Sequence, residues 1–137
     1  MGLTVLDAGV VIGFLDGDDA HHAVAHRALV RAVDGHDRLV LPASAYAETL
    51  VGPSRLGPTA VAVVQRFVAH LPVELAPLDA TIAEAAATLR ATHRSLKLPD
   101  ALVIATADVL DADLLLTTDR GWPSRSKLGL RATITKL

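Results

Sequence analysis

Four carboxylates in this chain are spaced so that a folded α/β domain would bring them together. Asp7 and Asp119 each follow a short apolar run, whereas Glu48 and Asp100 lie in segments of helical character. Mg²⁺ and Mn²⁺ prefer oxygen ligands, and ionised carboxylates that converge without a cation repel one another. The pattern therefore predicts a Mg²⁺ or Mn²⁺ site formed by Asp7, Glu48, Asp100 and Asp119.

Each acid also has a structural explanation of its own. Asp7 can cap a following helix, and Asp100, directly after Pro99, is favoured by the dipole at a helix start. Glu48 can be an exposed helix residue, and Asp119 can be a turn residue. Two hydroxyls favour the metal site instead: Ser44 lies one helical turn before Glu48, and Thr117, two residues before Asp119, can orient a carboxylate or a ligand water.

Positive charge is concentrated at the end of the chain, directly after Asp119. Residues 1–119 hold 15 acids against 8 Lys and Arg, whereas residues 120–137 hold five basic residues and no acid. A basic tail beside a metal site can hold the phosphates of a polyanion, so candidate RNA contacts are Arg120, Trp122, Arg125 and Lys127. The alternatives are ordinary surface charges for the basic residues and, for Trp122, a hydrophobic plug, which we favour over base stacking.

Strands and helices are predicted to alternate almost throughout the chain. Apolar runs predict strands at 3–6, 38–42, 72–77 and 114–118, with a weaker one at 132–136. Helices are predicted after the first strand, at 20–33 with Asp19 as its cap, from Ser44, at 59–71, from about 79 to 95, and at 99–110, with Gly52-Pro53 and Gly57-Pro58 as breaks. This order predicts a three-layer α/β/α sandwich with a mostly parallel central sheet, whose binding site lies at the carboxyl ends of the strands.

Composition limits the class of protein. The 137 residues suit a single domain spanning 1–137, and 51% of them are hydrophobic, although only four are aromatic. The chain has no cysteine, which excludes disulfides and thiolate metal sites. It begins without the basic region and long apolar stretch of a signal peptide, so we expect a cytoplasmic protein that does not enter membranes.

Four short motifs, taken in order, resemble those of PIN-domain ribonucleases, and the small size of the chain resembles the VapC toxins of toxin–antitoxin pairs. The motifs are Val5-Leu-Asp7-Ala, Ser44-x-x-x-Glu48, Leu98-Pro-Asp100-Ala-Leu and Leu115-Leu-Thr-Thr-Asp119-Arg-Gly-Trp122. The resemblance implies a PIN-like fold and an endoribonuclease whose four acids bind Mg²⁺ or Mn²⁺ and whose products carry 5′-phosphate and 3′-hydroxyl ends. It also implies inhibition of translation by the free toxin, a VapB-like antitoxin that covers the site, a homodimer, and a toxin–antitoxin hetero-oligomer.

One position departs from that family. The family often has Ser, Thr or Asn two residues after the first acid, where this chain has Gly9, so we expect altered metal affinity with the chemistry retained. Two alternatives stay open. One is a non-catalytic PIN-like module that binds RNA or an antitoxin; the other, less favoured because no Lys lies late in the chain beside the site, is a Mg²⁺-binding phosphoacceptor receiver domain.

Overall fold

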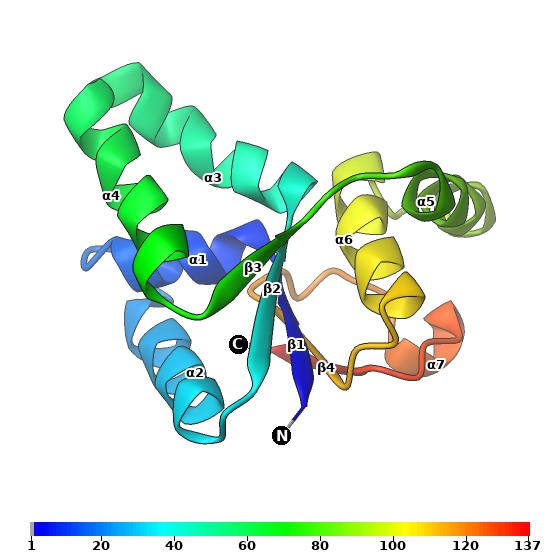
Figure 1. The fold of residues 1–137 in the computed structure, drawn as a ribbon. Helices are drawn as coiled ribbons and strands as arrows, with labels where there is room; N and C mark the ends of the chain where they lie inside the picture. The colour runs from blue at the N-terminus through cyan, green and yellow to red at the C-terminus, as the bar shows by residue number, and fades with distance from the viewer. Residues whose placement is uncertain (1) are drawn as a thin grey trace.

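A computed structural model of the protein describes residues 2–137, in which strands and helices alternate (Figure 1). The strands are β1 (Leu3–Leu6), β2 (Arg38–Pro42), β3 (Val73–Ala76), β4 (Leu114–Thr117) and β5 (Thr133–Lys136). The helices are α1 (Ala8–Leu15), α2 (His22–Asp34), α3 (Ala43–Leu56), α4 (Pro58–His70), α5 (Ala80–Thr92), α6 (Leu98–Val109) and α7 (Arg125–Leu128). All five predicted strands are confirmed to within a residue or two at each end.

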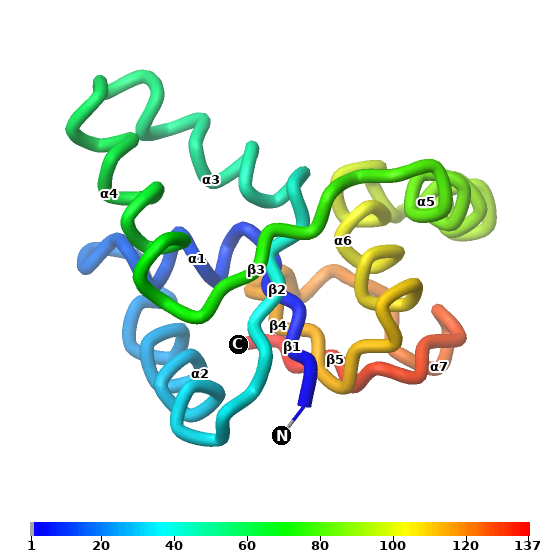
Figure 2. Tube along the Cα trace, in the orientation of Figure 1, coloured from blue at the N-terminus to red at the C-terminus, as the bar shows by residue number. Residues whose placement is uncertain are grey.

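The sheet is parallel throughout, with the strand order β3-β2-β1-β4-β5. In the central strand, Val5 is paired with Val40 on one side and with Leu115 on the other. Helices α1, α2 and α4 cover one face of the sheet, and α5, α6 and α7 lie on the other (Figure 1). Figure 2 shows β5 beside β4 at the far edge. The predicted three-layer α/β/α sandwich is confirmed.

The core consists mainly of aliphatic side chains. Parallel strands covered on both faces read as continuous apolar runs, and Val5, Leu6 and Leu115 are accordingly fully buried or nearly so. In α6, almost every residue from Ala101 to Ala107 is buried, and the small alanines let this helix pack closely against the sheet and α5. Phe67 and Trp122 are the aromatic residues buried in this core.

Three local predictions were wrong. Gly52-Pro53 does not end a helix: α3 continues through both residues to Leu56, and the break comes at Gly57, whose φ of 125° favours glycine. A residue before proline is disfavoured in the helical conformation because its Cβ and backbone N–H clash with the proline ring, and Gly52 has no Cβ, which weakens this restriction. Asp19 does not cap α2 at residue 20, because its carboxylate accepts from the amide of His21 and the helix begins at His22.

The third difference is α7, a short helix between β4 and β5, where no helix was predicted; its amino end is capped by the Ser124 hydroxyl, which accepts from the Lys127 amide. Across residues 2–137, the helices are too short or too polar to cross a membrane.

Candidate active site

The strand order places a binding site at the carboxyl ends of β1 and β4. From β1 the chain builds β2 and β3 on one side, and then returns across the sheet to add β4 and β5 on the other. In open α/β sheets, ligands bind outside the carboxyl ends of the strands where the order reverses in this way. Asp7 directly follows β1, Thr117 ends β4, and Asp119 lies two residues later. The two strand-end acids therefore lie at the switch point of the sheet.

A chain of hydrogen bonds connects these two acids. The Thr117 hydroxyl donates to Asp7 Oδ2 at 2.8 Å and accepts from the Asp119 backbone amide at 3.0 Å. The other oxygen of Asp7 accepts from the Ala8 amide at 2.9 Å, so Asp7 is also the cap of α1. Because Asp7 and Thr117 are both buried, this network fixes the orientation of the Asp7 carboxylate. The contact of the Thr117 hydroxyl with Asp7 supports the orienting role that was predicted for Thr117.

The four predicted acids influence one another electrostatically. Burial raises the pKa of Asp7 from 3.8 to about 6; the hydrogen bonds from Thr117 and Ala8 oppose this rise, and the charges of Asp100 and Glu48 add to it. Burial and the Asp100 charge raise the pKa of Glu48. Burial and the Asp119 charge raise the pKa of Asp100. Asp100 thus interacts with each of the other three, so the fold brings the four acids into one electrostatic cluster.

Three of the acids line a common pocket of about 340 Å³, and Asp7 joins them through the Thr117 hydroxyl. The pocket is lined by Glu48, Ser95, Leu96, Lys97, Pro99, Asp100, Asp119, Gly121 and Trp122. The sequence reasoning missed Ser95 and Lys97. Lys97 precedes α6 by one residue and lowers the pKa of Asp100, and its position three residues before that acid was the available signal.

The donor set suits a hard divalent cation. Carboxylate oxygens are the ligands that Mg²⁺ and Mn²⁺ prefer, and a cation among them would relieve the mutual repulsion that raises their pKa values. Within residues 2–137, the structure holds no group of three or more His, Asp or Glu side chains already arranged as a metal site. The cluster therefore supplies the ligand chemistry without forming a closed coordination cage.

The other predicted residues are placed less directly. Ser44 is half-buried in the first turn of α3 and does not line the pocket. Trp122 is only 4% exposed, as expected of a hydrophobic plug, although its ring reaches the pocket wall. Arg120 and Lys127 are exposed, and Arg125, also exposed, donates from Nε to the Leu130 carbonyl.

The last lysine of the basic tail has a structural role that the sequence did not suggest. Lys136 Nζ, in β5, donates to the carbonyl oxygens of Trp122 at 2.7 Å and Arg120 at 3.3 Å. It thereby ties the loop that carries Asp119 to the edge of the sheet. Arg131, also in the tail, pairs with Asp111 at 3.3 Å. These two basic residues of the tail thus make contacts within the protein.

The fold explains why position 9 is a glycine. A Cβ at this position would collide with the Thr118 hydroxyl oxygen, which occupies the space where a side chain would begin. Thr118 follows directly after β4, so Gly9 permits close approach of the start of α1 to the end of that strand.

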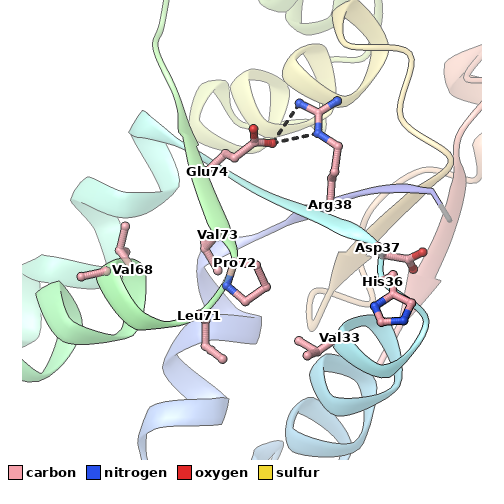
Figure 3. Close-up of a pocket in the computed structure, with 10 residues that line it drawn as sticks. Val33, His36, Asp37, Arg38, Val68, Leu71, Pro72, Val73 and Glu74 are labelled. Carbon is pink, nitrogen blue, oxygen red and sulfur yellow. Dashed lines mark hydrogen bonds and ion pairs between the residues drawn. The ribbon is translucent and has the colours of Figure 1, made fainter.

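A second hollow, of about 600 Å³, lies at the amino ends of β2 and β3, the opposite end of the sheet from the acids (Figure 3). Its floor includes Val33, Leu71 and Val73, and on its rim Arg38 pairs with Glu74 at 2.9 Å. It is larger than the acid pocket, but Arg38 and Glu74 pair with each other, and its other carboxylate, Asp37, accepts from the Gly2 amide. The candidate site with converging carboxylates is therefore the pocket at the carboxyl ends of the strands.

Comparison with known proteins gives a family match over most of the chain. A family described as PIN domain matches residues 4–128. The comparison with curated proteins gives no match.

Solved structures with the same fold include VapBC2 from Rickettsia felis bound to a promoter DNA fragment (TM-score 0.75, 13% identity, 98% of each chain covered). Another is Mycobacterium tuberculosis VapC20, described as a sarcin–ricin loop cleaving toxin (TM-score 0.72, 17% identity, covering 93% of this chain and 95% of that one). A third is a toxin–antitoxin complex from Klebsiella pneumoniae (TM-score 0.66, 22% identity, covering 88% and 92%). At these identities, the likeness shows a common fold.

Proposed function

Because the chain belongs to the PIN domain family, we propose that it is a metal-dependent endoribonuclease that hydrolyses RNA phosphodiester bonds. The observation that carries this proposal is the cluster at the switch point, where a buried hydroxyl connects Asp7 to Asp119 and Asp100 interacts with all three other acids. Few functions other than holding a cation account for so much negative charge gathered around one pocket.

The roles of the residues follow from their positions. Asp7, Glu48, Asp100 and Asp119 would hold Mg²⁺ or Mn²⁺, and such an ion, when bound, lowers the pKa of an attacking water and neutralises charge on the phosphate. The Thr117 hydroxyl keeps Asp7 and Asp119 in a fixed relation. Lys97, on the pocket wall, offers a positive charge to an RNA phosphate. Since burial raises the pKa of Asp7 to about 6, acidification protonates this ligand and should reduce activity.

We extend the proposal to the biological role. The protein would be the toxin of a VapBC-type pair, would inhibit translation when free, and would form a homodimer and a complex with a VapB-like antitoxin. The similar folds described as VapBC2, as a toxin–antitoxin complex and as a sarcin–ricin loop cleaving toxin support this extension. Arg120, Arg125 and Lys127, which do not line the pocket themselves, remain the proposed RNA contacts.

An apolar groove beside the acids is the proposed seat of the antitoxin. It measures about 680 Å³ and lies among α1, α3 and α4, where Ile12, Leu56 and Val63 expose apolar surface. Glu48 lines both this groove and the acid pocket. An apolar segment of the antitoxin seated in the groove would therefore end at the acids and could block them.

The experiment that tests the activity is incubation of the purified protein with total bacterial RNA, with Mg²⁺ or Mn²⁺ or with EDTA, followed by mapping of fragment ends. We expect discrete cleavage that leaves 5′-phosphate ends, that needs metal, and that Asp7→Asn abolishes. Asp108→Asn, an exposed acid near the other end of α6, is the matched control and should cleave as wild type does. Metal-independent cleavage that leaves 2′,3′-cyclic phosphate would contradict the proposal.

Two alternatives are separated by the same experiment and by the topology. A folded, metal-binding protein that cleaves no class of RNA would favour the non-catalytic RNA- or antitoxin-binding module. The receiver-domain alternative is disfavoured by the sheet, because receivers have the flavodoxin-like order 2-1-3-4-5 and this sheet is ordered 3-2-1-4-5.

A further inference from the structure

Trp122 carries a polar group that the fold leaves without a partner. Its side chain is buried. Among the buried side-chain nitrogen and oxygen atoms of residues 2–137, the indole Nε1 is the one that has no hydrogen-bond partner. Buried donors are nearly always paired, because an unpaired one loses its hydration and gains nothing in return. A lone exception in the wall of a charged pocket therefore calls for a functional explanation.

The surroundings of the indole identify the acceptor. Trp122 and Asp100 line the same pocket, and carboxylate oxygens are the strong acceptors there. Burial and the charge of Asp119 raise the pKa of the Asp100 carboxyl, and the indole N–H opposes this rise as a weak donor to that carboxylate, although the contact falls short of full hydrogen-bonding geometry.

The ring is fixed while the carboxylate has room to adjust. The Trp122 carbonyl is held by Lys136 Nζ, and the preceding Gly121 amide donates to Asp119 Oδ1 at 2.8 Å. Asp100 lies in the first turn of α6, is only half-buried, and faces the open pocket. A small movement of the Asp100 side chain would thus close the gap, whereas a movement of the ring would disturb the core.

We propose that Trp122 is a positioning residue whose indole N–H donates to one oxygen of Asp100 when the other oxygen binds a divalent cation. A carboxylate can accept at both oxygens, and a hydrogen bond to the oxygen away from the metal orients the ligand. The inference rests on the proposed metal site and adds to it a ligand-orienting residue outside the four acids.

Nuclear magnetic resonance tests the contact directly, because Trp122 is the only tryptophan of the chain and gives one indole N–H signal. During titration of the ¹⁵N-labelled protein with Mg²⁺ alone, we expect the indole proton to move downfield and to saturate together with the amide signals of Asp100 and Asp119. In Asp100→Ala, the indole signal should not respond. An indole signal that stays in place while the pocket amides shift would overturn the inference and leave the metal site standing.

Metal affinity provides the second readout, measured as free Mn²⁺ by electron paramagnetic resonance. Trp122→Phe keeps an aromatic plug without the N–H and should bind Mn²⁺ roughly 10-fold to 100-fold more weakly, the usual loss when a ligand-orienting partner is removed. Tyr46→Phe, which removes a polar group from an aromatic residue that does not line the pocket, should bind like wild type. Equal affinity of Trp122→Phe and wild type would overturn this inference alone, whereas absence of Mg²⁺ and Mn²⁺ binding by wild type would overturn the metal site with it.

Discussion

At the scale of single residues, Asp7 serves the site at a cost to the fold. It caps α1 and accepts two hydrogen bonds, yet burial still raises its pKa to about 6. Folding therefore opposes ionisation of this carboxylate, although a metal ligand must be ionised. A residue retained at such a cost is typical of a site where function and stability conflict.

The conflict predicts that Asp7→Asn is more stable than wild type when metal is absent. Because the folded-state pKa is raised, the favourable contribution of Asp7 is complete below about pH 4 and is lost as the pH rises through about 6. The rise from 3.8 to about 6 corresponds to roughly 3 kcal/mol, the upper limit for the gain at neutral pH. Urea unfolding of both proteins in EDTA across this range measures the gain. Mg²⁺ should reduce it by stabilising wild type, and a pH-independent difference would contradict the argument.

Gly9 leads to a second prediction at the same scale. Gly9→Ser must displace the Thr118 hydroxyl, and overpacking of this kind typically destabilises by about 1–3 kcal/mol. Adding Thr118→Ala should recover much of the loss, which a double-mutant cycle of thermal unfolding would detect. We also expect Gly9→Ser to bind Mg²⁺ with altered affinity; identical metal titrations of the variant and wild type would show that position 9 does not influence the site.

At the scale of elements, the loop after β4 depends on a strand that follows it. Residues 118–124 carry Asp119 and Trp122, and Lys136 of β5 fastens both Arg120 and Trp122 by their carbonyl oxygens. The edge strand is therefore part of the support of the site.

Lys136→Met, which keeps most of the apolar stem and removes the donor, should loosen this loop. Hydrogen bonds to charged groups contribute about 1.5–3 kcal/mol, so we expect a loss of stability of that order and faster amide hydrogen exchange at residues 120–122. Lys127→Met, at an exposed position of α7, is the matched control. Exchange in this loop that is unchanged by Lys136→Met would show that other contacts hold it.

The same elements show which features of the fold the sequence predicts and which it does not. Apolar runs ending in Asp7 and Asp119 sufficed to predict parallel strands with acids at their carboxyl ends, because those signals are local. The Lys136 tether and the contact of Gly9 with Thr118 join distant parts of the chain, and no local pattern encodes them. The helical course of Gly52-Pro53 was missed because the dipeptide is a turn signal, although its steric basis is weaker when the residue before proline has no Cβ.

At the scale of the whole molecule, the acid pocket and the apolar groove are adjacent, since Glu48 lines both. The α3–α4 pair extends from the sheet and forms much of the groove (Figure 1). Leu56 at the end of α3 is 82% exposed, and with Ile12 and Val63 it forms an exposed apolar patch of the kind that marks interaction sites.

Leu56→Ser should therefore leave the free protein folded and active but weaken binding of the cognate antitoxin by about 10-fold or more, as expected of an apolar anchor. Isothermal calorimetry gives the affinity, and the RNA cleavage assay gives the activity. Leu78→Ser, at another exposed leucine away from the groove, is the control. Full affinity of Leu56→Ser would place the antitoxin elsewhere.

The hydrogen bond between Asp7 and Thr117 spans 110 positions of the chain, and β1 finds its partner β4 only after most of the protein has been made. Synthesis proceeds from the amino end, and contacts between distant segments form late. A growing chain that has not yet released β4 from the ribosome cannot fix the Asp7 carboxylate or bring Asp119 to it. The order of assembly thus delays the appearance of the acid cluster until translation of this domain is nearly complete.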